Sequence, residues 1–201
     1  MQVQGILLAA GYGRRFDAEG GQDKLLVQMD DGRPVLWHSA RALTAVLPNC
    51  LAVIRPGQVL RARWLTDAGC RVLESTAAEA GMGSALAAAV GASRGASGWV
   101  VALADMPWLD ASAVAAVAAG IDAPQRLVAM THRGRRGHPV GFGSAWGEQL
   151  AALTGDTGAR ALLAGQDIRL IDWPDDSVLR DIDRPADLDR TQAGPRRGAA
   201  A

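Results

Sequence analysis

Short apolar runs alternate along this chain with longer segments in which apolar residues recur every three or four positions. The runs at 3–9, 51–54, 70–73 and 99–104 predict strands, and the longer segments at 35–46, 58–67 and 84–93 predict helices. Strands that alternate with helices form a mostly parallel sheet with helices on both faces. The pattern therefore predicts an α/β fold whose ligands bind at the carboxyl edge of the sheet.

The second half of the chain continues the alternation. Strands are expected at 127–131, 139–142 and 168–171, and helices at 110–119, 144–153, 155–164 and shortly after 181–185. Asp110, Ser144 and the stretch 155–158 resemble helix caps. We expect a basic turn at 132–137, inside a segment from about 126 to 146 that projects as a lid over the strand ends. The chain is expected to form one domain over 1–190, followed by a disordered tail over 191–201.

Composition excludes several classes of protein. The chain has 21 Lys and Arg against 21 Asp and Glu, and this balance argues against a general nucleic-acid binder. No apolar run approaches the roughly 20 residues of a membrane span, and no leader-like segment precedes the first strand. Cys50 and Cys70 form neither a metal-type pair nor a disulfide framework, so a reducing cytoplasm is the default location.

A glycine-rich stretch follows the first strand. Gly11 and Gly13 are followed by the adjacent cations Arg14 and Arg15, and further on by Lys24, which is the only lysine of the chain. Glycines let backbone N–H groups close around an anion, and the cations supply the counter-charge. A compact ammonium can reach a phosphate oxygen in a space too narrow for a broad guanidinium.

Two common phosphate-loop patterns fail at this stretch. The string Gly-x4-Gly-Lys-Ser/Thr is absent, and a dinucleotide fingerprint would need glycine where Phe16 stands. The remaining interpretations are a nucleotide loop of another type, with Arg15 and Lys24 reaching the phosphates, and a plain turn with solvated arginines. Taken alone, the stretch favours neither.

Asp105 is a sharper signal because it directly follows the apolar strand at 99–104. A carboxylate at the edge of the sheet suits Mg²⁺, which takes one or two carboxylates and completes its shell with phosphates and water. The alternative is that Asp105 only caps the turn toward Leu109. Asp181 and Asp183 follow the last strand, and one of them is a second candidate ligand.

Three further motifs carry weaker signals. The Gly81-Met82-Gly83-Ser84 stretch opens a helix that offers N–H groups to an anion or a base edge, although taken alone it is better explained as an ordinary helix cap at Ser84. His138 follows Arg133, Arg135 and Arg136, a local anion patch that on its own is more often a solvated face. Arg160 lies one helical turn from Asp156, either as an intrahelical pair or as a phosphate ligand. No nucleophile–base pair is evident.

In order, these stretches resemble the molybdenum cofactor nucleotidyltransferases. The resemblance covers about residues 3–190 and rests on six motifs: Leu8-Ala9-Ala10-Gly11-x-Gly13-x-Arg15 with Lys24, Gly81-Met82-Gly83-Ser84, Leu103-Ala104-Asp105-Met106-Pro107, Arg136-Gly137-His138-Pro139-Val140, Gly155-Asp156-x-Gly158-Ala159-Arg160 and Asp181-Ile182-Asp183-x-Pro185. Ala10, in place of a second glycine, is similar to the cytidylyltransferase branch. The sequence departs from the family at Phe16, where Met is usual, in a longer segment at 17–22, and at Ala85, where a second Ser is common.

The resemblance implies a Rossmann-like nucleotide-diphospho-sugar transferase fold and the transfer of a nucleotidyl group, CMP from CTP in the favoured case, to the terminal phosphate of molybdopterin. It implies catalytic roles for Arg15, Lys24 and Asp105, with Mg²⁺ on Asp105 and Asp183. The implied nucleotide-binding residues are Leu8, Ala9, Ala10, Gly11, Gly13, Arg14, Arg15, Lys24, Gly81, Met82, Gly83 and Ser84, and the implied acceptor-binding residues are His138 and Arg160. The alternatives are transfer to another phosphorylated acceptor, such as a sugar 1-phosphate or a methylerythritol phosphate, and a protein that escorts finished cofactor to an apo-molybdoenzyme.

Overall fold

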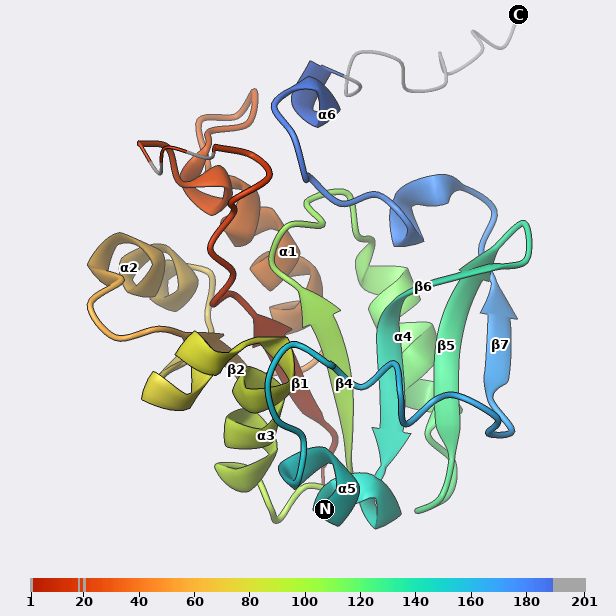
Figure 1. The fold of residues 1–201 in the computed structure, drawn as a ribbon. Helices are drawn as coiled ribbons and strands as arrows, with labels where there is room; N and C mark the ends of the chain where they lie inside the picture. The colour runs from red at the N-terminus through yellow and green to blue at the C-terminus, as the bar shows by residue number, and fades with distance from the viewer. Residues whose placement is uncertain (1, 18, 20, 190–201) are drawn as a thin grey trace, which may run out of the picture.

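The computed structural model describes residues 2–17, 19 and 21–189, and it centres on a seven-stranded sheet of order β3-β2-β1-β4-β6-β5-β7 (Figure 1). The strands are β1 Gln4–Leu8, β2 Cys50–Ile54, β3 Arg71–Glu74, β4 Gly98–Leu103, β5 Leu127–His132, β6 Arg135–Gly143 and β7 Arg169–Asp172. Only β6 runs against the other six of these strands. The predicted mostly parallel sheet is therefore confirmed.

Helices pack on both faces of the sheet and bury two separate sets of apolar side chains. One set joins helices α1 Val35–Thr44, α2 Val59–Asp67 and α4 Ala111–Gly120 to one face, and the other joins α3 Met82–Gly91 and α5 Gly147–Ala151 to the opposite face. Successive residues of a strand point to opposite faces, so Ile6 packs in one set and Leu7 in the other. The result is a three-layer α/β structure.

Most predicted elements agree with the structure to within one or two residues at each end, but the segment at 126–146 does not form the expected lid. It supplies β5 and β6, which lie inside the sheet. The turn between them is confined to Arg133 and Gly134, not the whole of 132–137, and Arg133 adopts a positive φ of 49°. Glycines allow the close packing of β6: a Cβ at Gly137 would approach the Val178 carbonyl oxygen, and one at Gly141 would lie 2.8 Å from Val117.

One predicted helix is wrong, and another is only partly α-helical. Residues 155–164 form successive turns, in which the amides of Leu162, Leu163 and Ala164 donate to the carbonyls three residues before them. The helix expected over 144–153 is a 3₁₀ turn at Ser144–Trp146 followed by the short α5, and Ser144 makes no side-chain cap. Asp110, in contrast, caps α4 as expected by accepting a hydrogen bond from the Ser112 amide.

Four short elements complete the path. They are the 3₁₀ turns η1 Lys24–Leu26, η2 Thr76–Ala80 and η4 Asp176–Val178, and the helix α6 Ala186–Asp189. The predicted tail over 191–201 lies outside the described residues. Among the residues that are described, no helix is both long and apolar enough to cross a membrane.

Candidate active site

The glycine-rich loop and Asp105 meet because their strands are neighbours. Leu8 at the end of β1 pairs with Leu103 at the end of β4, and the Ala104 amide donates to the Leu8 carbonyl at 3.1 Å. Both chains therefore leave the sheet at the same point of its carboxyl edge, the place where open α/β sheets bind ligands. Asp105 and the glycine-rich loop therefore line the same cavity at this edge.

Lys24 is buried against the acidic side of this edge. Its Nζ donates to Asp105 Oδ2 at 2.6 Å and to the Ile182 carbonyl at 2.8 Å, and it lies 3.6 Å from Asp183 Oδ1. Asp23 holds the turn that carries it, since its carboxylate accepts from the Leu25 amide and caps η1. In this state the ammonium neutralises carboxylates and is not free for a phosphate.

Three carboxylates gather around the lysine. One oxygen from each of Asp105, Asp181 and Asp183 lies within 4.8 Å of the other two. Arg15, largely exposed, bonds Asp183 at 2.5 Å. Burial raises the pKa of Asp181 above its ordinary value, and the charges of Asp105 and Asp183 raise it further. The residues alone left open which of Asp181 and Asp183 joins Asp105, and the family resemblance implied Asp183. In the structure both Asp181 and Asp183 lie beside Asp105.

The donor set fits a divalent cation. Asp105 Oδ1 is buried and has no hydrogen-bond partner among the described residues, whereas its Oδ2 is bound to Lys24. An unpartnered buried carboxylate oxygen is costly, and coordination of a hard cation would satisfy it. Mg²⁺ accepts such carboxylate oxygens together with water and phosphate.

Two arginines that the motif analysis missed support the glycine-rich loop from behind. Arg55, just after β2, donates to the Ala10 carbonyl at 2.9 Å and stacks over the Tyr12 ring at 3.7 Å from its centroid. Arg61 of α2 donates to the carbonyls of Ala9 and Gly11. One signal could have revealed Arg61: it precedes the buried Leu65 by four residues, and a charge on the inner face of a helix needs a buried partner.

A cavity of about 650 Å³ opens over this loop. Of the predicted nucleotide-binding residues, Leu8, Ala10, Gly11, Gly13, Arg14, Arg15, Lys24, Gly81 and Met82 line it, whereas Ala9, Gly83 and Ser84 do not. Ala9 is fully buried. The amides of Gly83 and Ser84 both donate to the Gly155 carbonyl, and Ser84 Oγ accepts from the Gly155 amide. The start of α3 is thus tied to the 154–156 turn, and two of its expected anion donors are already occupied.

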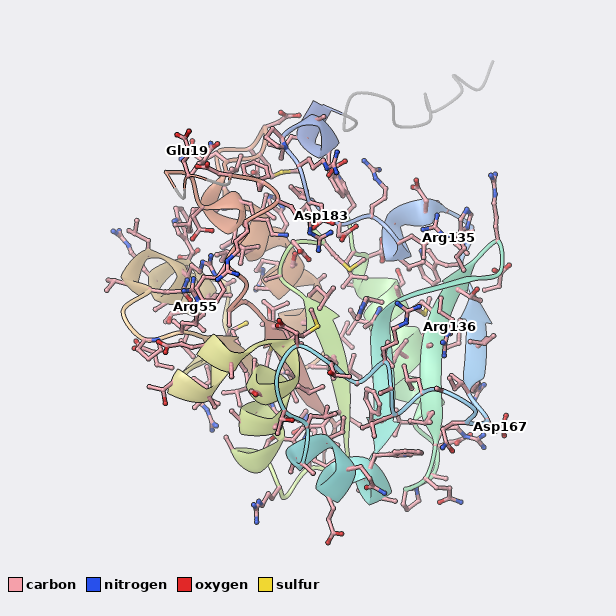
Figure 2. All side chains as sticks on the ribbon, viewed as in Figure 1. Glu19, Arg55, Arg135, Arg136, Asp167 and Asp183 are labelled. Carbon is pink, nitrogen blue, oxygen red and sulfur yellow. The ribbon has the colours of Figure 1, made fainter. Side chains whose placement is uncertain are left out.

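A second cavity, of about 1120 Å³, adjoins the first and shares four lining residues with it: Leu8, Met82, Leu103 and Asp156. Arg135, Arg136, His138 and Arg160 line it together with apolar side chains that include Leu86, Val140 and Phe142. In Figure 2, Arg136 lies to the right of Asp183 and lower in the view, toward β6. The two predicted acceptor-binding residues, His138 and Arg160, therefore belong to the same cavity.

The titratable groups that line the second cavity are three arginines, the Asp156 carboxylate and the His138 imidazole. No ion pair joins Asp156 and Arg160 in the described chain, so the intrahelical pair considered from the sequence does not form. Burial lowers the pKa of His138, while a hydrogen bond to the Val101 backbone and the charge of Asp105 act in the opposite direction. A lowered pKa keeps this imidazole neutral at pH 7, and the positive charge of the cavity comes from its arginines.

Comparison with known proteins places these features in a family. The signature of the MobA-like NTP transferase domain matches residues 5–170. A search of curated proteins finds no match. Among solved structures, Rv0371c from Mycobacterium tuberculosis H37Rv is similar at 24% identity over 96% of this chain and 100% of its own, with a TM-score of 0.74. Another crystal structure of that protein is described as a complex with manganese, at 21% identity over 94% of this chain and 97% of its own, with a TM-score of 0.68.

Two further structures share the fold. A nucleotidyl transferase from Methanothermobacter thermautotrophicus is 20% identical over 94% of this chain and 95% of its own, with a TM-score of 0.79. The 4-diphosphocytidyl-2C-methyl-D-erythritol synthase of Anaerococcus prevotii is 12% identical over 96% and 95%, with a TM-score of 0.73. These similarities confirm the predicted nucleotide-diphospho-sugar transferase-like fold.

Proposed function

The chain belongs to the MobA-like NTP transferase domains, and on that premise we propose that it transfers CMP from CTP to the terminal phosphate of molybdopterin. Family membership supports the class of reaction, nucleotidyl transfer from a nucleoside triphosphate. The choice of CTP rests on Ala10, and the choice of acceptor rests on the order of the six motifs.

The observation that carries the proposal is the pair of adjoining cavities. The first contains the glycine-rich loop, Lys24 and the three carboxylates, and the second contains Arg135, Arg136 and Arg160. Because Leu8, Met82, Leu103 and Asp156 line both cavities, substrates bound in the two cavities would lie next to each other. A transferase needs this arrangement, because the reacting atoms of both substrates must approach to about 3–3.5 Å.

The second cavity suits an acceptor that has an anionic group and a broad apolar body. Its arginines provide fork-shaped donors that match a phosphate, and Leu86, Val140 and Phe142 provide an apolar wall. The neutral imidazole of His138 can hydrogen-bond a heterocycle without adding charge. A pterin that carries a terminal phosphate has both properties.

The reaction forms one P–O bond and breaks one. An acceptor phosphate oxygen attacks the α-phosphorus of CTP, the bond from that phosphorus to the β-phosphate oxygen breaks, and pyrophosphate leaves. The attacking oxygen is already ionised, so no general base is required, which agrees with the absence of a nucleophile–base pair from the sequence. Catalysis then rests on positioning and on neutralising charge.

The chain's own residues would divide this work. Arg14, Arg15 and Lys24 would face the β- and γ-phosphates, and the amides of the 10–13 turn would donate to phosphate or base. Arg160 and Arg136 would hold the acceptor phosphate near the residues that line both cavities. Asp105, Asp181 and Asp183 would hold Mg²⁺, which when bound neutralises phosphate charge and favours departure of pyrophosphate.

The closest alternative is transfer to a different phosphorylated acceptor. The fold is shared with an enzyme named for a diphosphocytidyl-methylerythritol product, and the first cavity would look alike in both cases. A second alternative, in which the protein escorts finished cofactor to an apo-molybdoenzyme, predicts a stable complex with that enzyme and no release of pyrophosphate.

The test is an assay of pyrophosphate release by the purified protein with Mg²⁺, molybdopterin and each of the four common ribonucleoside triphosphates. We expect release with CTP to exceed release with GTP. No release with any triphosphate, under conditions where a known family member is active, would refute the catalytic proposal. Release with a sugar 1-phosphate or methylerythritol phosphate but not with molybdopterin would keep the nucleotidyl transfer and replace the acceptor.

A further inference from the structure

We propose that Arg61, which lies outside both cavities, is a positioning residue. It holds the glycine-rich turn and Lys24 at the relative position that triphosphate binding requires. The inference rests on the proposed function, since it concerns the same triphosphate site. It assigns a role to a helix, α2, that contributes no side chain to the cavity lining.

The contacts of Arg61 join two parts of the chain. Its Nε and Nη2 donate to both oxygens of Asp23, at 2.6 and 2.8 Å. Its Nη1 donates to the Ala9 carbonyl at 2.6 Å and to the Gly11 carbonyl at 3.1 Å, and Nη2 also reaches the Gly11 carbonyl at 3.1 Å. The side chain is only 3% exposed. One guanidinium therefore holds the start and the end of the loop together.

The two joined parts are the ones the proposed chemistry uses. Asp23 is adjacent to Lys24 and caps the turn that carries it. Gly11 begins the turn of the first cavity. Residues 12–22 separate Gly11 from Asp23 in the sequence, so the chain connection alone does not fix the distance between these two residues. The fork of Arg61 sets that separation through fixed donor geometry, which a flexible ammonium would not do.

The same contacts orient the backbone amides of the turn. In a trans peptide the C=O and the following N–H point in opposite directions. Arg61 holds the carbonyls of Ala9 and Gly11, and Arg55 holds that of Ala10, so the amides of residues 10, 11 and 12 are turned away from these guanidiniums. Among the described residues none of these three amides donates a hydrogen bond. Successive unpartnered amides of this kind form an anion-binding concavity.

The experiment compares Arg61→Met and Arg61→Lys with the matched control Arg63→Met, which removes an exposed arginine two residues along the same helix. The readouts are thermal stability, the dissociation constant of CTP with Mg²⁺, and the kcat and KM values for CTP and for the acceptor. We expect Arg61→Met to lower kcat/KM for CTP about 100-fold, as a misplaced binding group does. The acceptor KM should stay near its wild-type value, and Arg61→Lys should recover part of the loss.

A double variant separates positioning from general damage. If Arg61 acts through Lys24, the losses from Arg61→Met and Lys24→Met should sum to more than the loss measured in the double variant. Should Arg61→Met fail to fold, Asp23→Asn serves instead, because it weakens one arm of the pair and leaves the carbonyl contacts of Arg61 in place. We expect Asp23→Asn to lower kcat with CTP relative to the Arg63→Met control, while the thermal stability of the two variants stays similar.

The outcomes distinguish this proposal from the proposed function. A wild-type protein that releases no pyrophosphate refutes the function, and the effect of Arg61→Met on CTP affinity then still tests the positioning. An active wild type, together with a folded Arg61→Met variant that binds and uses CTP as the control does, overturns the role of Arg61 alone. Additive losses in the double variant would likewise refute coupling through Lys24.

Discussion

Lys24 binds the same carboxylates that we propose as ligands for Mg²⁺. It is the only lysine of the chain, and it is bound to Asp105 and the Ile182 carbonyl with Asp183 close by. The same carboxylates are the ones that fit Mg²⁺. On the proposed function, the ammonium and a divalent cation would compete for Asp105 and Asp183, and Lys24 would have to release these carboxylates before it could reach a triphosphate.

Lys24→Met should separate these two roles. We expect turnover to fall more than tenfold, because a cation facing the phosphates is lost. In the absence of nucleotide, we expect Mg²⁺ or Mn²⁺ to bind roughly tenfold more tightly, because an ammonium within 4 Å of the ligands no longer opposes a cation. Isothermal titration with each metal alone measures the second effect.

The control is Arg94→Met, which removes an exposed positive charge beyond the far end of α3 and should leave metal affinity unchanged. Metal affinity that is equal or weaker in Lys24→Met would show that the lysine and the metal do not compete. Turnover near the wild-type rate would remove Lys24 from catalysis.

At the scale of elements, the junction between α3 and the 154–156 turn was the hardest part to predict. The sequence correctly indicated that a helix opens near Gly81, and it assigned Gly155–Gly158 to the start of another helix. In the structure the second segment is a turn packed against the first. The Gly155 carbonyl accepts from the amides of Gly83 and Ser84, and Ser84 Oγ accepts from the Gly155 amide. A local pattern cannot reveal this, because the partners lie about 70 residues apart.

Gly81→Ala tests this packing. A Cβ at Gly81 would collide with Asp156 Oδ1 and lie 2.7 Å from the Asp156 amide nitrogen, and the residue has a positive φ of 129°. We expect the free energy of unfolding to fall by about 1–3 kcal/mol and CTP binding to weaken, because the 155–156 turn must move. Chemical denaturation and CTP titration measure the two effects.

Gly91→Ala is the matched control in the same helix. Nothing lies within 4 Å of a Cβ at Gly91, so alanine should stabilise the protein by about 0.5–1 kcal/mol through its higher helix propensity. If Gly81→Ala behaved like Gly91→Ala in both measurements, the packing of this junction would not be important for stability or for the nucleotide cavity.

At the scale of the whole molecule, the fold was largely predictable and the site only in part. Continuous apolar runs indicate buried strands, and apolar residues every three or four positions indicate helices that pack on a core, so the sheet, its covering helices and the edge position of Asp105 followed from the sequence. The antiparallel direction of β6 could not be predicted, because it depends on pairing with strands that are distant in sequence. Arg55 was missed because the partner of its guanidinium is the Ala10 backbone carbonyl, which has no sequence signature. Arg61 was missed because its partners are two further carbonyls and the carboxylate of Asp23, which lies 38 residues away.

The two-cavity arrangement predicts that the substrates can be perturbed separately. Arg160 lines the second cavity and not the first. We expect Arg160→Ala to raise the KM of the acceptor by about tenfold or more, as the loss of a charge-assisted hydrogen bond does, and to leave the dissociation constant of CTP within about twofold of wild type. Steady-state kinetics with each substrate varied in turn measures the difference.

Arg94→Ala serves as the control here, since it removes an exposed arginine outside both cavities. A rise in the dissociation constant of CTP equal to the rise in acceptor KM would contradict the division of labour between the cavities, because it would place Arg160 in contact with the nucleotide.

The reversed direction of β6 has a consequence for how such a protein diversifies. Because β6 runs against β4, its first residues, Arg135 to His138, lie beside the end of β4, and the β5–β6 hairpin turns immediately before them. On the proposed function, changes in this one hairpin would reshape the wall that faces the acceptor, and no residue of the hairpin lines the first cavity. Selectivity for the acceptor can thus evolve, or be engineered, as a module that is independent of the nucleotide chemistry.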